Sequence, residues 1–225
     1  MIARIRTNIP NGLTCANLCC GCLGVIQTFQ GSVQWAAYLI YLAAFFDFAD
    51  GLAARWLRVQ GALGKELDSL ADVISFGALP GFILFQLMTQ AQAGRWSYLA
   101  MLVPIFSALR LAKFNTDPRQ TDSFIGVPTP ANALLISGLP FAGEYLPWLL
   151  GFPALAAVAI LMSWLLVAEL PLLALKFKGW SWQTYKFQYI LIASGMVLLF
   201  AFKFAAIPLI VLIYIGLSVI KKIAS

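Results

Sequence analysis

Histidine is absent from this 225-residue chain, and acidic residues are few, nine against fifteen Lys and Arg. Without histidine there is no imidazole general base, no His-based nucleophile triad and no His metal ligand. The cysteines all lie in one apolar segment, at spacings unlike those of a zinc site: Cys15, Cys19, Cys20 and Cys22. We interpret them as small packing residues and expect no structural disulfide.

Charge is scarce because long apolar runs fill most of the chain. Hydrophobic residues make up 61% of the sequence and charged residues 11%, and the mean hydropathy is +0.86. This composition excludes a soluble domain and predicts an all-α, polytopic integral membrane protein with one membrane domain over residues 1–225. The net charge of +6 is then expected to mark one side of the bilayer, and we expect no nucleic-acid partner.

The apolar runs predict about eight transmembrane helices. Residues 1–12 are too polar and too short for a cleaved signal peptide, and we expect them to form a juxtamembrane segment. Residues 13–175 are expected to hold six spans that form the catalytic core. The last apolar stretch, 189–220, would be roughly 48 Å long as one helix, beyond a ~30 Å bilayer core, and Lys203 and Pro208 near its middle predict two additional spans. The six core spans are expected at 13–29, 33–56, 65–87, 96–114 and 131–148, with a sixth reaching about residue 175.

The distribution of cations tests this count. With eight spans and a cytoplasmic N-terminus, only Arg95 and Lys203 of the fifteen cations fall outside. That asymmetry agrees with the excess of Lys and Arg in cytoplasmic loops and predicts that the active site faces the cytoplasm. We expect the membrane to be a prokaryotic inner membrane. Seven spans, the alternative, would place Lys221 and Lys222 outside.

Four of the nine acidic residues lie in one stretch, residues 47–72. Asp47 and Asp50 are three residues apart, and Asp68 and Asp72 are four apart, so on helices each pair shares a face. On adjacent antiparallel helices the two pairs can converge, and carboxylates in an apolar setting need a counter-charge. Oxygen ligands alone favour Mg²⁺ or Mn²⁺, and a pair of such ions is a known arrangement for phosphoryl transfer.

Small residues beside the aspartates predict a cavity. Gly51 and Ala54 accompany the first pair and Gly64 precedes the second, which leaves room for a ligand to lie against the backbone. Arg55 and Lys65 can add positive charge against a phosphate. The alternative is that the aspartates are structural and pair with the nearby cations at the helix ends, Arg55, Arg58 or Lys65.

The full pattern, Asp47-x₂-Asp50-Gly51-x₂-Ala54-Arg55-x₈-Gly64-x₃-Asp68-x₃-Asp72, resembles the signature of the CDP-alcohol phosphotransferase family at every defined position. The resemblance implies a six-helix membrane core, a homodimer and a polar cavity open to the cytoplasm. It implies that Asp47, Asp50, Asp68 and Asp72 bind the metals, and that Asp72 is also the base. It further implies a CDP-lipid site with CMP as leaving group, formed by Asn17, Asp50, Gly51, Ala54, Arg55, Gly64, Lys65 and Asp68.

Other segments resemble the phosphatidylserine synthase branch of that family: 9–11 with Asn17, 64–72, 75–77, 110–115 and 124–128. This resemblance implies transfer of the phosphatidyl group of CDP-diacylglycerol to L-serine, with phosphatidylserine and CMP as products. A serine site needs a cation for the carboxylate, so we propose Arg110 as serine ligand with Asn115 assisting. The alternative for Arg110 is a membrane anchor at a helix end.

Two other functions stay open. The same chemistry could use glycerol 3-phosphate or inositol phosphate, although a phosphorylated acceptor needs more cations than Arg110 and Lys113 readily supply. A cation transporter could also use intramembrane aspartates, but such proteins usually carry inverted repeats, and we find no internal repeat.

Overall fold

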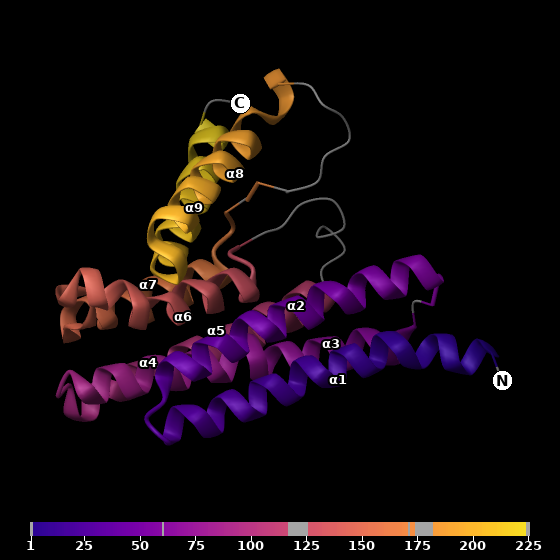
Figure 1. Ribbon diagram of the computed structural model, residues 1–225, viewed down its shortest axis with the longest axis horizontal. Coiled ribbons are helices and arrows are strands. Elements are labelled where there is room, and N and C mark those ends of the chain that lie inside the picture. The colour runs from indigo at the N-terminus through magenta and orange to yellow at the C-terminus, as the bar shows by residue number, and fades with distance from the viewer. Residues whose placement is uncertain (1, 60, 117–125, 171, 174–181, 224–225) are drawn as a thin grey trace.

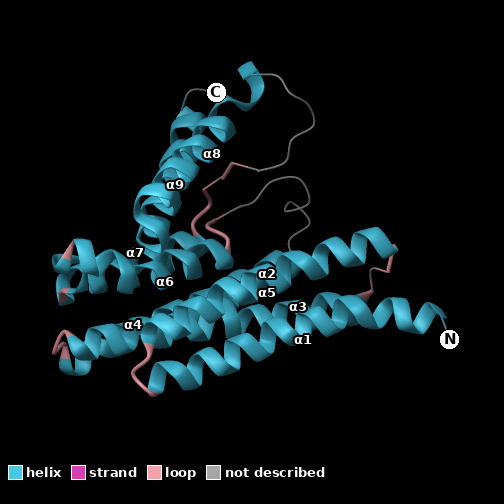
Figure 2. Cartoon of the chain, in the orientation of Figure 1, coloured by secondary structure: helices cyan, strands magenta, loops and turns pink. Residues whose placement is uncertain are grey.

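The computed structural model describes residues 2–59, 61–116, 126–170, 172–173 and 182–223, and the side chains of 2–7 and 182–184 are not considered. Within these ranges all regular structure is helical, with loops confined to connections between helices (Figure 2). Five helical stretches are long and apolar enough to cross a membrane, Asn8–Phe29, Val33–Leu57, Ala62–Gln90, Gly94–Thr116 and Tyr185–Ile223. The expected all-α, polytopic membrane architecture is confirmed, whereas the count of eight spans stays a prediction.

Long helices from the first half of the chain lie side by side (Figure 1). α1 (Ile2–Phe29) turns at Gly31, which has a φ of +82°, into α2 (Val33–Leu57). α3 (Ala62–Asp72) continues without a break through a π-helical turn, Val73–Ala78, into α4 (Leu79–Gln90). A 3₁₀ segment, Gly94–Met101, leads into α5 (Leu102–Thr116).

The π-helical turn of the α3–α4 helix packs against both α1 and α5. It follows Asp72 directly, and its Ser75, Phe76 and Gly77 are buried. A Cβ on Gly77 would lie 3.0 Å from Cβ of Ser107 on α5, so only glycine allows this approach. Such π turns widen a helix locally and occur often beside functional sites.

The second half of the chain adds two helix pairs. α6 (Thr129–Tyr145) and α7 (Phe152–Val167) pack beside the first bundle, joined by a 3₁₀ turn at Pro147–Leu150. α8 (Trp182–Phe202) and α9 (Ile207–Ile223) form a hairpin closed by the 3₁₀ segment Lys203–Ala206. The helix is interrupted near Lys203, where the sequence analysis divides the last apolar stretch, and the assignment of two separate spans stays a prediction. The hairpin runs at a steep angle to α1–α5 (Figure 1).

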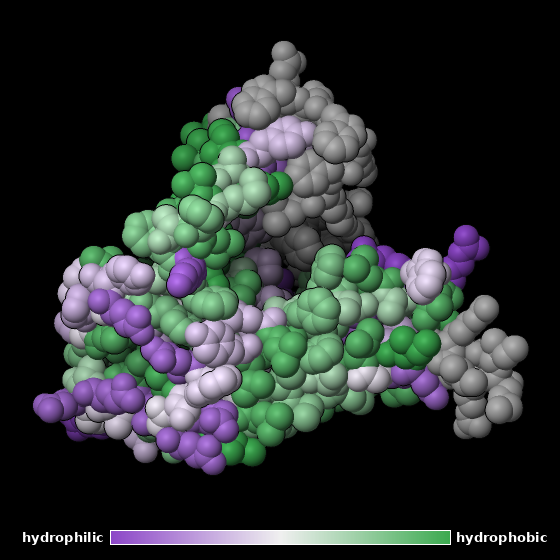
Figure 3. Space-filling model, viewed as in Figure 1, coloured by the Kyte–Doolittle hydropathy of each residue, from purple (hydrophilic) through white to green (hydrophobic). Residues whose placement is uncertain are grey.

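The surface has the distribution expected for a bilayer. Apolar side chains cover the middle of the long helices and much of the α8–α9 hairpin, while polar residues gather toward the ends of the bundle (Figure 3). Large apolar side chains are fully open, such as Trp56 at 86% exposed and Phe200 at 93%. Lipid is the environment that makes such exposure favourable.

The first helix is longer than the predicted first span. α1 begins at Ile2, so the expected juxtamembrane segment is helical from that residue, and the start of the span at residue 13 stays a prediction. Pro10 removes one backbone hydrogen bond of this helix, but tertiary contacts hold the turn: Asn11 packs on Gly64 of α3, and Thr14 bonds to Asp50 of α2.

The predicted sixth span, to about residue 175, also ends early, because α7 stops at Val167. Ala168 is extended, and the backbone of Leu170 accepts a hydrogen bond from Gly126 N at 3.0 Å. Pro171 follows in the sequence, and a residue before proline avoids the helical region. Glu169, expected inside the span, is instead exposed beyond its end.

Candidate active site

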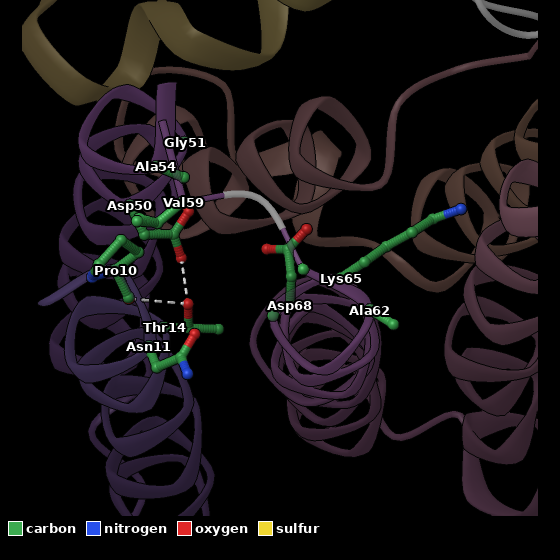
Figure 4. A pocket seen from close by; sticks show the side chains of 12 residues that line it. Pro10, Asn11, Thr14, Asp50, Gly51, Ala54, Val59, Ala62, Lys65 and Asp68 are labelled. Carbon is green, nitrogen blue, oxygen red and sulfur yellow. Dashed lines mark hydrogen bonds between the residues drawn. The ribbon is translucent and has the colours of Figure 1, made fainter. Parts of the chain in front are cut away.

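Three carboxylates from two helices converge. Asp47 and Asp50 of α2 and Asp68 of α3 each place an oxygen atom within 4.8 Å of the other two. Their spacing puts them on facing sides of antiparallel helices, as the sequence predicted. Asp50 and Asp68 point toward each other across a cavity (Figure 4).

Asp72 lies one turn beyond Asp68 and is buried, with 8% of its surface exposed. Its Oδ1 accepts a hydrogen bond from Nδ2 of Asn17 at 3.2 Å. It lies close enough to Asp47 and Asp68 to interact with them electrostatically, although it is outside the group of three. The fourth predicted ligand is therefore beside the cluster and tied to α1.

Helix α1 supplies the hydrogen bonds that orient these carboxylates. Thr14 Oγ1 donates to Oδ2 of Asp50 at 2.6 Å and lies 3.1 Å from the carbonyl oxygen of Pro10 (Figure 4). The backbone oxygen of Asn17 accepts from Ser75 Oγ at 2.9 Å, which fixes α1 against the π-helical turn. Sequence reasoning missed Thr14. The available signal was a hydroxyl three residues before Asn17, on the same helix face.

No basic side chain neutralises the cluster within the part of the chain that the structure describes. Arg55 Nε donates to the carbonyl oxygen of Gly51 at 2.9 Å, and Lys65 Nζ donates to that of Asn115 at 3.3 Å. The alternative in which the aspartates pair with these two cations is therefore wrong for the described structure.

The cluster instead has the properties of a cation site. One carboxylate oxygen from each of Asp47, Asp50 and Asp68 lies within 4.8 Å of the other two, and carboxylates gathered this closely favour a bound cation or proton. Asp68 Oδ1 is buried without a hydrogen-bond partner. A set of oxygen donors only, with net negative charge, fits Mg²⁺ or Mn²⁺.

A cavity of about 500 Å³ opens beside the cluster between α1, α2 and α3. It contains most of the predicted CDP-lipid residues, and Thr14, Pro10 and Asn11 of α1 complete one wall. A side chain at Gly51 would project into the cavity, because Arg55 Nη2, at 4.0 Å, is the only neighbouring atom of the described residues within that distance of a Cβ placed on Gly51. Lys65 lines the cavity, but its ammonium group points away from Asp68 (Figure 4). The predicted residues in the lining are Asp50, Gly51, Ala54, Gly64, Lys65 and Asp68.

The two predicted serine ligands have different surroundings. Arg110 is 7% exposed, donates from Nη1 to Thr129 Oγ1 at 2.9 Å, and interacts electrostatically with Asp72. Burial beside Asp72 is not the position of a membrane-surface anchor. Asn115 is half-buried and donates from Nδ2 to Ser69 Oγ of α3 at 2.8 Å.

Comparison with known sequences identifies the family of the chain. The sequence model of the CDP-alcohol phosphatidyltransferase family matches residues 7–221. The chain belongs to this family. It is therefore a member of a metal-dependent transferase family and an integral membrane protein, and the carboxylate cluster is where a metal fits.

Several curated relatives of this CDP-alcohol phosphatidyltransferase are serine-specific by name. The chain is 32% identical over 133 residues to CDP-diacylglycerol–serine O-phosphatidyltransferase of Bacillus subtilis, covering 59% of this chain and 75% of the relative. It is 34% identical over 138 residues to the enzyme of that name from Mycobacterium leprae, 58% and 46% of the two chains. It is 34% identical over 162 residues to archaetidylserine synthase of Methanothermobacter thermautotrophicus, 69% and 67%. The chain spans about half the length of the mycobacterial and Helicobacter pylori relatives that it matches.

Proposed function

We propose that this CDP-alcohol phosphatidyltransferase transfers the phosphatidyl group of CDP-diacylglycerol to the hydroxyl of L-serine, giving phosphatidylserine and CMP in phospholipid biosynthesis. The observation that carries the proposal is the convergence of Asp47, Asp50 and Asp68 beside a cavity. Buried Asp72 follows Asp68 by one turn and interacts electrostatically with buried Arg110. The names of the relatives support serine as acceptor.

In this proposal the carboxylates of Asp47, Asp50, Asp68 and Asp72 hold a pair of Mg²⁺ or Mn²⁺ ions. The ions, when bound, would neutralise the diphosphate and the charge that develops on it. Gly51, together with Ala54 and Gly64, leaves room for the cytidine end of the lipid.

The reaction needs one proton transfer. The serine hydroxyl oxygen forms a bond to the β-phosphorus, and the bond from that phosphorus to the bridging oxygen breaks, so CMP leaves with the bridging oxygen. Asp72 accepts the hydroxyl proton, and Asn17, which donates to Asp72 Oδ1, keeps the other oxygen free for that proton. Arg110 binds the serine carboxylate, because its planar guanidinium group can donate two parallel hydrogen bonds to a carboxylate.

The remaining parts of the proposal concern the setting of the enzyme. The active site faces the cytoplasm at the inner membrane, as the distribution of cations favours. The chain works as a homodimer, as the family resemblance implies. Asn115 orders the end of α5 beside the acceptor site through Ser69 and Lys65.

An acceptor competition assay tests this proposal. The purified protein in lipid vesicles is given radiolabelled CDP-diacylglycerol with serine, glycerol 3-phosphate or inositol phosphate, each with Mg²⁺ or Mn²⁺. We expect CMP release and a labelled lipid with serine alone. A lipid product from glycerol 3-phosphate but not from serine would overturn the choice of acceptor. Cation flux without CMP release would indicate a transporter instead.

A further inference from the structure

A buried amide on α6 has no role in the site described so far. Asn132 lies in the first turns of α6 and is 0% exposed, yet neither Nδ2 nor Oδ1 has a hydrogen-bond partner. A buried donor or acceptor left unpaired is strongly unfavourable, and native proteins retain few of them. An amide with both ends unpaired therefore points to a partner that binds there.

The position of Asn132 follows from its helix. Thr129 is three residues earlier and therefore on the same face of α6. Thr129 Oγ1 accepts the hydrogen bond from Arg110, so this face is turned toward the guanidinium group. α6 also packs on the π-helical turn that follows Asp72. Asn132 thus lies one turn further along α6 than the Arg110–Thr129 pair.

Two more unpaired groups lie on the facing helix. Arg110 Nε is buried without a partner, and so is Oγ of Ser107, three residues before it on α5. Gly77 of the π-helical turn packs on Ser107, which places this hydroxyl on the inner side of α5. Buried unpaired groups therefore lie one helical turn from each end of the Arg110–Thr129 hydrogen bond, Ser107 on α5 and Asn132 on α6.

The chemistry of this region suits a small zwitterion. Arg110 offers only donors and binds a carboxylate, whereas Asn132 offers a neutral acceptor, Oδ1, and a donor, Nδ2. A phosphorylated acceptor would need further cations. An ammonium group needs oxygen acceptors, and a neutral amide supplies one without repelling the adjacent carboxylate of the ligand.

We propose that Asn132 is a specificity residue of the acceptor site, in which Oδ1 accepts from the ammonium group of serine and Nδ2 donates to its carboxylate beside Arg110. This inference rests on the proposed function, since it concerns the acceptor of the same reaction. It adds α6 to a site otherwise formed by α1, α2, α3 and α5.

The test separates acceptor recognition from folding. In Asn132→Leu an apolar side chain of similar size replaces both unpaired groups, a change that leaves stability equal or higher if the amide has no protein partner. We expect KM for serine to rise about tenfold or more, the loss of one or two charge-assisted hydrogen bonds, with KM for CDP-diacylglycerol unchanged. The two KM values of Asn132→Ala are measured in parallel. If the leucine variant does not fold, the alanine variant is expected to show the same rise in KM for serine.

Ser137→Ala is the matched control. Ser137 is equally buried on the same helix, and its Oγ donates to the carbonyl oxygen of Leu134 within α6. This variant should leave both KM values unchanged.

An acceptor analogue identifies the group that Asn132 binds. 3-Hydroxypropionate keeps the hydroxyl and the carboxylate of serine but lacks the ammonium group. The wild-type protein should prefer serine to it, and Asn132→Leu should lose most of that preference. If the wild-type protein turns over serine and both Asn132 variants have the wild-type KM for serine, this inference is overturned while the proposed function stands. Absence of serine turnover in the wild-type protein would overturn the proposed function. A lower melting temperature together with a rise of both KM values would show that Asn132 has a packing role, and this result would also overturn the inference.

Discussion

The metal half and the acceptor half of the candidate site are built in opposite ways. The metal half gathers Asp47, Asp50 and Asp68 with no basic partner among the described residues. The proposed acceptor half holds one buried cation, Arg110, which donates to Thr129 and interacts electrostatically with Asp72. An excess of negative charge recruits cations, whereas a single buried cation selects a small anion by shape and hydrogen bonds. We therefore expect the metal half to determine the turnover rate and the acceptor half to determine which acceptor is used.

Removal of divalent ions should give the largest effect, because it acts on the metal half as a whole. We expect treatment with EDTA to reduce CMP release to background, a loss of about 10³-fold or more, and Mg²⁺ or Mn²⁺ to restore it. The apoprotein should also melt at a lower temperature, since the like charges are left unscreened and bound ligand no longer favours the folded state. Full activity after exhaustive chelation, with ions absent by elemental analysis, would remove the cluster from the reaction.

Asp72→Asn is expected to have the next largest effect. The substituted amide cannot take up the proton of the acceptor hydroxyl, so turnover should fall about 10²–10⁴-fold. Its oxygen can still accept from Asn17, so the melting temperature and the binding of CDP-diacylglycerol should stay near those of the wild-type protein. Asp72→Asn therefore separates proton transfer from lipid binding. Turnover within a few-fold of the wild-type value would exclude Asp72 as the base.

Arg110→Gln tests the acceptor half. The variant keeps a hydrogen-bond donor for Thr129 but loses the charge, and we expect KM for serine to rise about 30-fold or more, on the scale of a buried charged pair. KM for CDP-diacylglycerol should stay the same. The measurement is a pair of saturation curves at a fixed concentration of divalent ion. An equal rise of both KM values would show that Arg110 holds the diphosphate, and the division between two halves would fail.

The same division explains what the sequence could predict. Asp47, Asp50, Asp68 and the small residues beside them lie on neighbouring helices, so three- and four-residue spacings sufficed to bring them together. The pairing of Arg110 with Thr129, or of Asn17 with Asp72, depends on how helices distant in sequence pack, and no local period contains that information. The early end of α7 was missed because most residues from Leu165 to Leu175 are apolar, although Pro171 was an available signal. The hydrogen bonds from residues 126–127 to the backbone of that segment could not be predicted from the sequence.

Thr14→Val should produce the smallest effect, and it probes how far the metal half depends on α1. The variant keeps the shape of the side chain but removes the donor to Asp50 Oδ2. Hydrogen bonds to metal-binding carboxylates orient them, and their loss typically weakens metal affinity about 10-fold. We expect the concentration of Mn²⁺ or Mg²⁺ needed for half-maximal activity to rise by about that factor, with maximal activity recovered at saturating metal and KM for serine unchanged.

The same helix supplies a matched control for that substitution. Thr28 is also buried on α1, and its Oγ1 donates to the carbonyl oxygen of Gly24 four residues earlier, but it has no carboxylate partner among the described residues. Thr28→Val therefore removes an equivalent intrahelical hydrogen bond at a distance from the cluster and should leave the metal dependence as it is. If the two variants shift the metal dependence equally, the effect belongs to the stability of α1. If only Thr14→Val shifts it, α1 forms part of the metal half, although it contributes none of the four carboxylates.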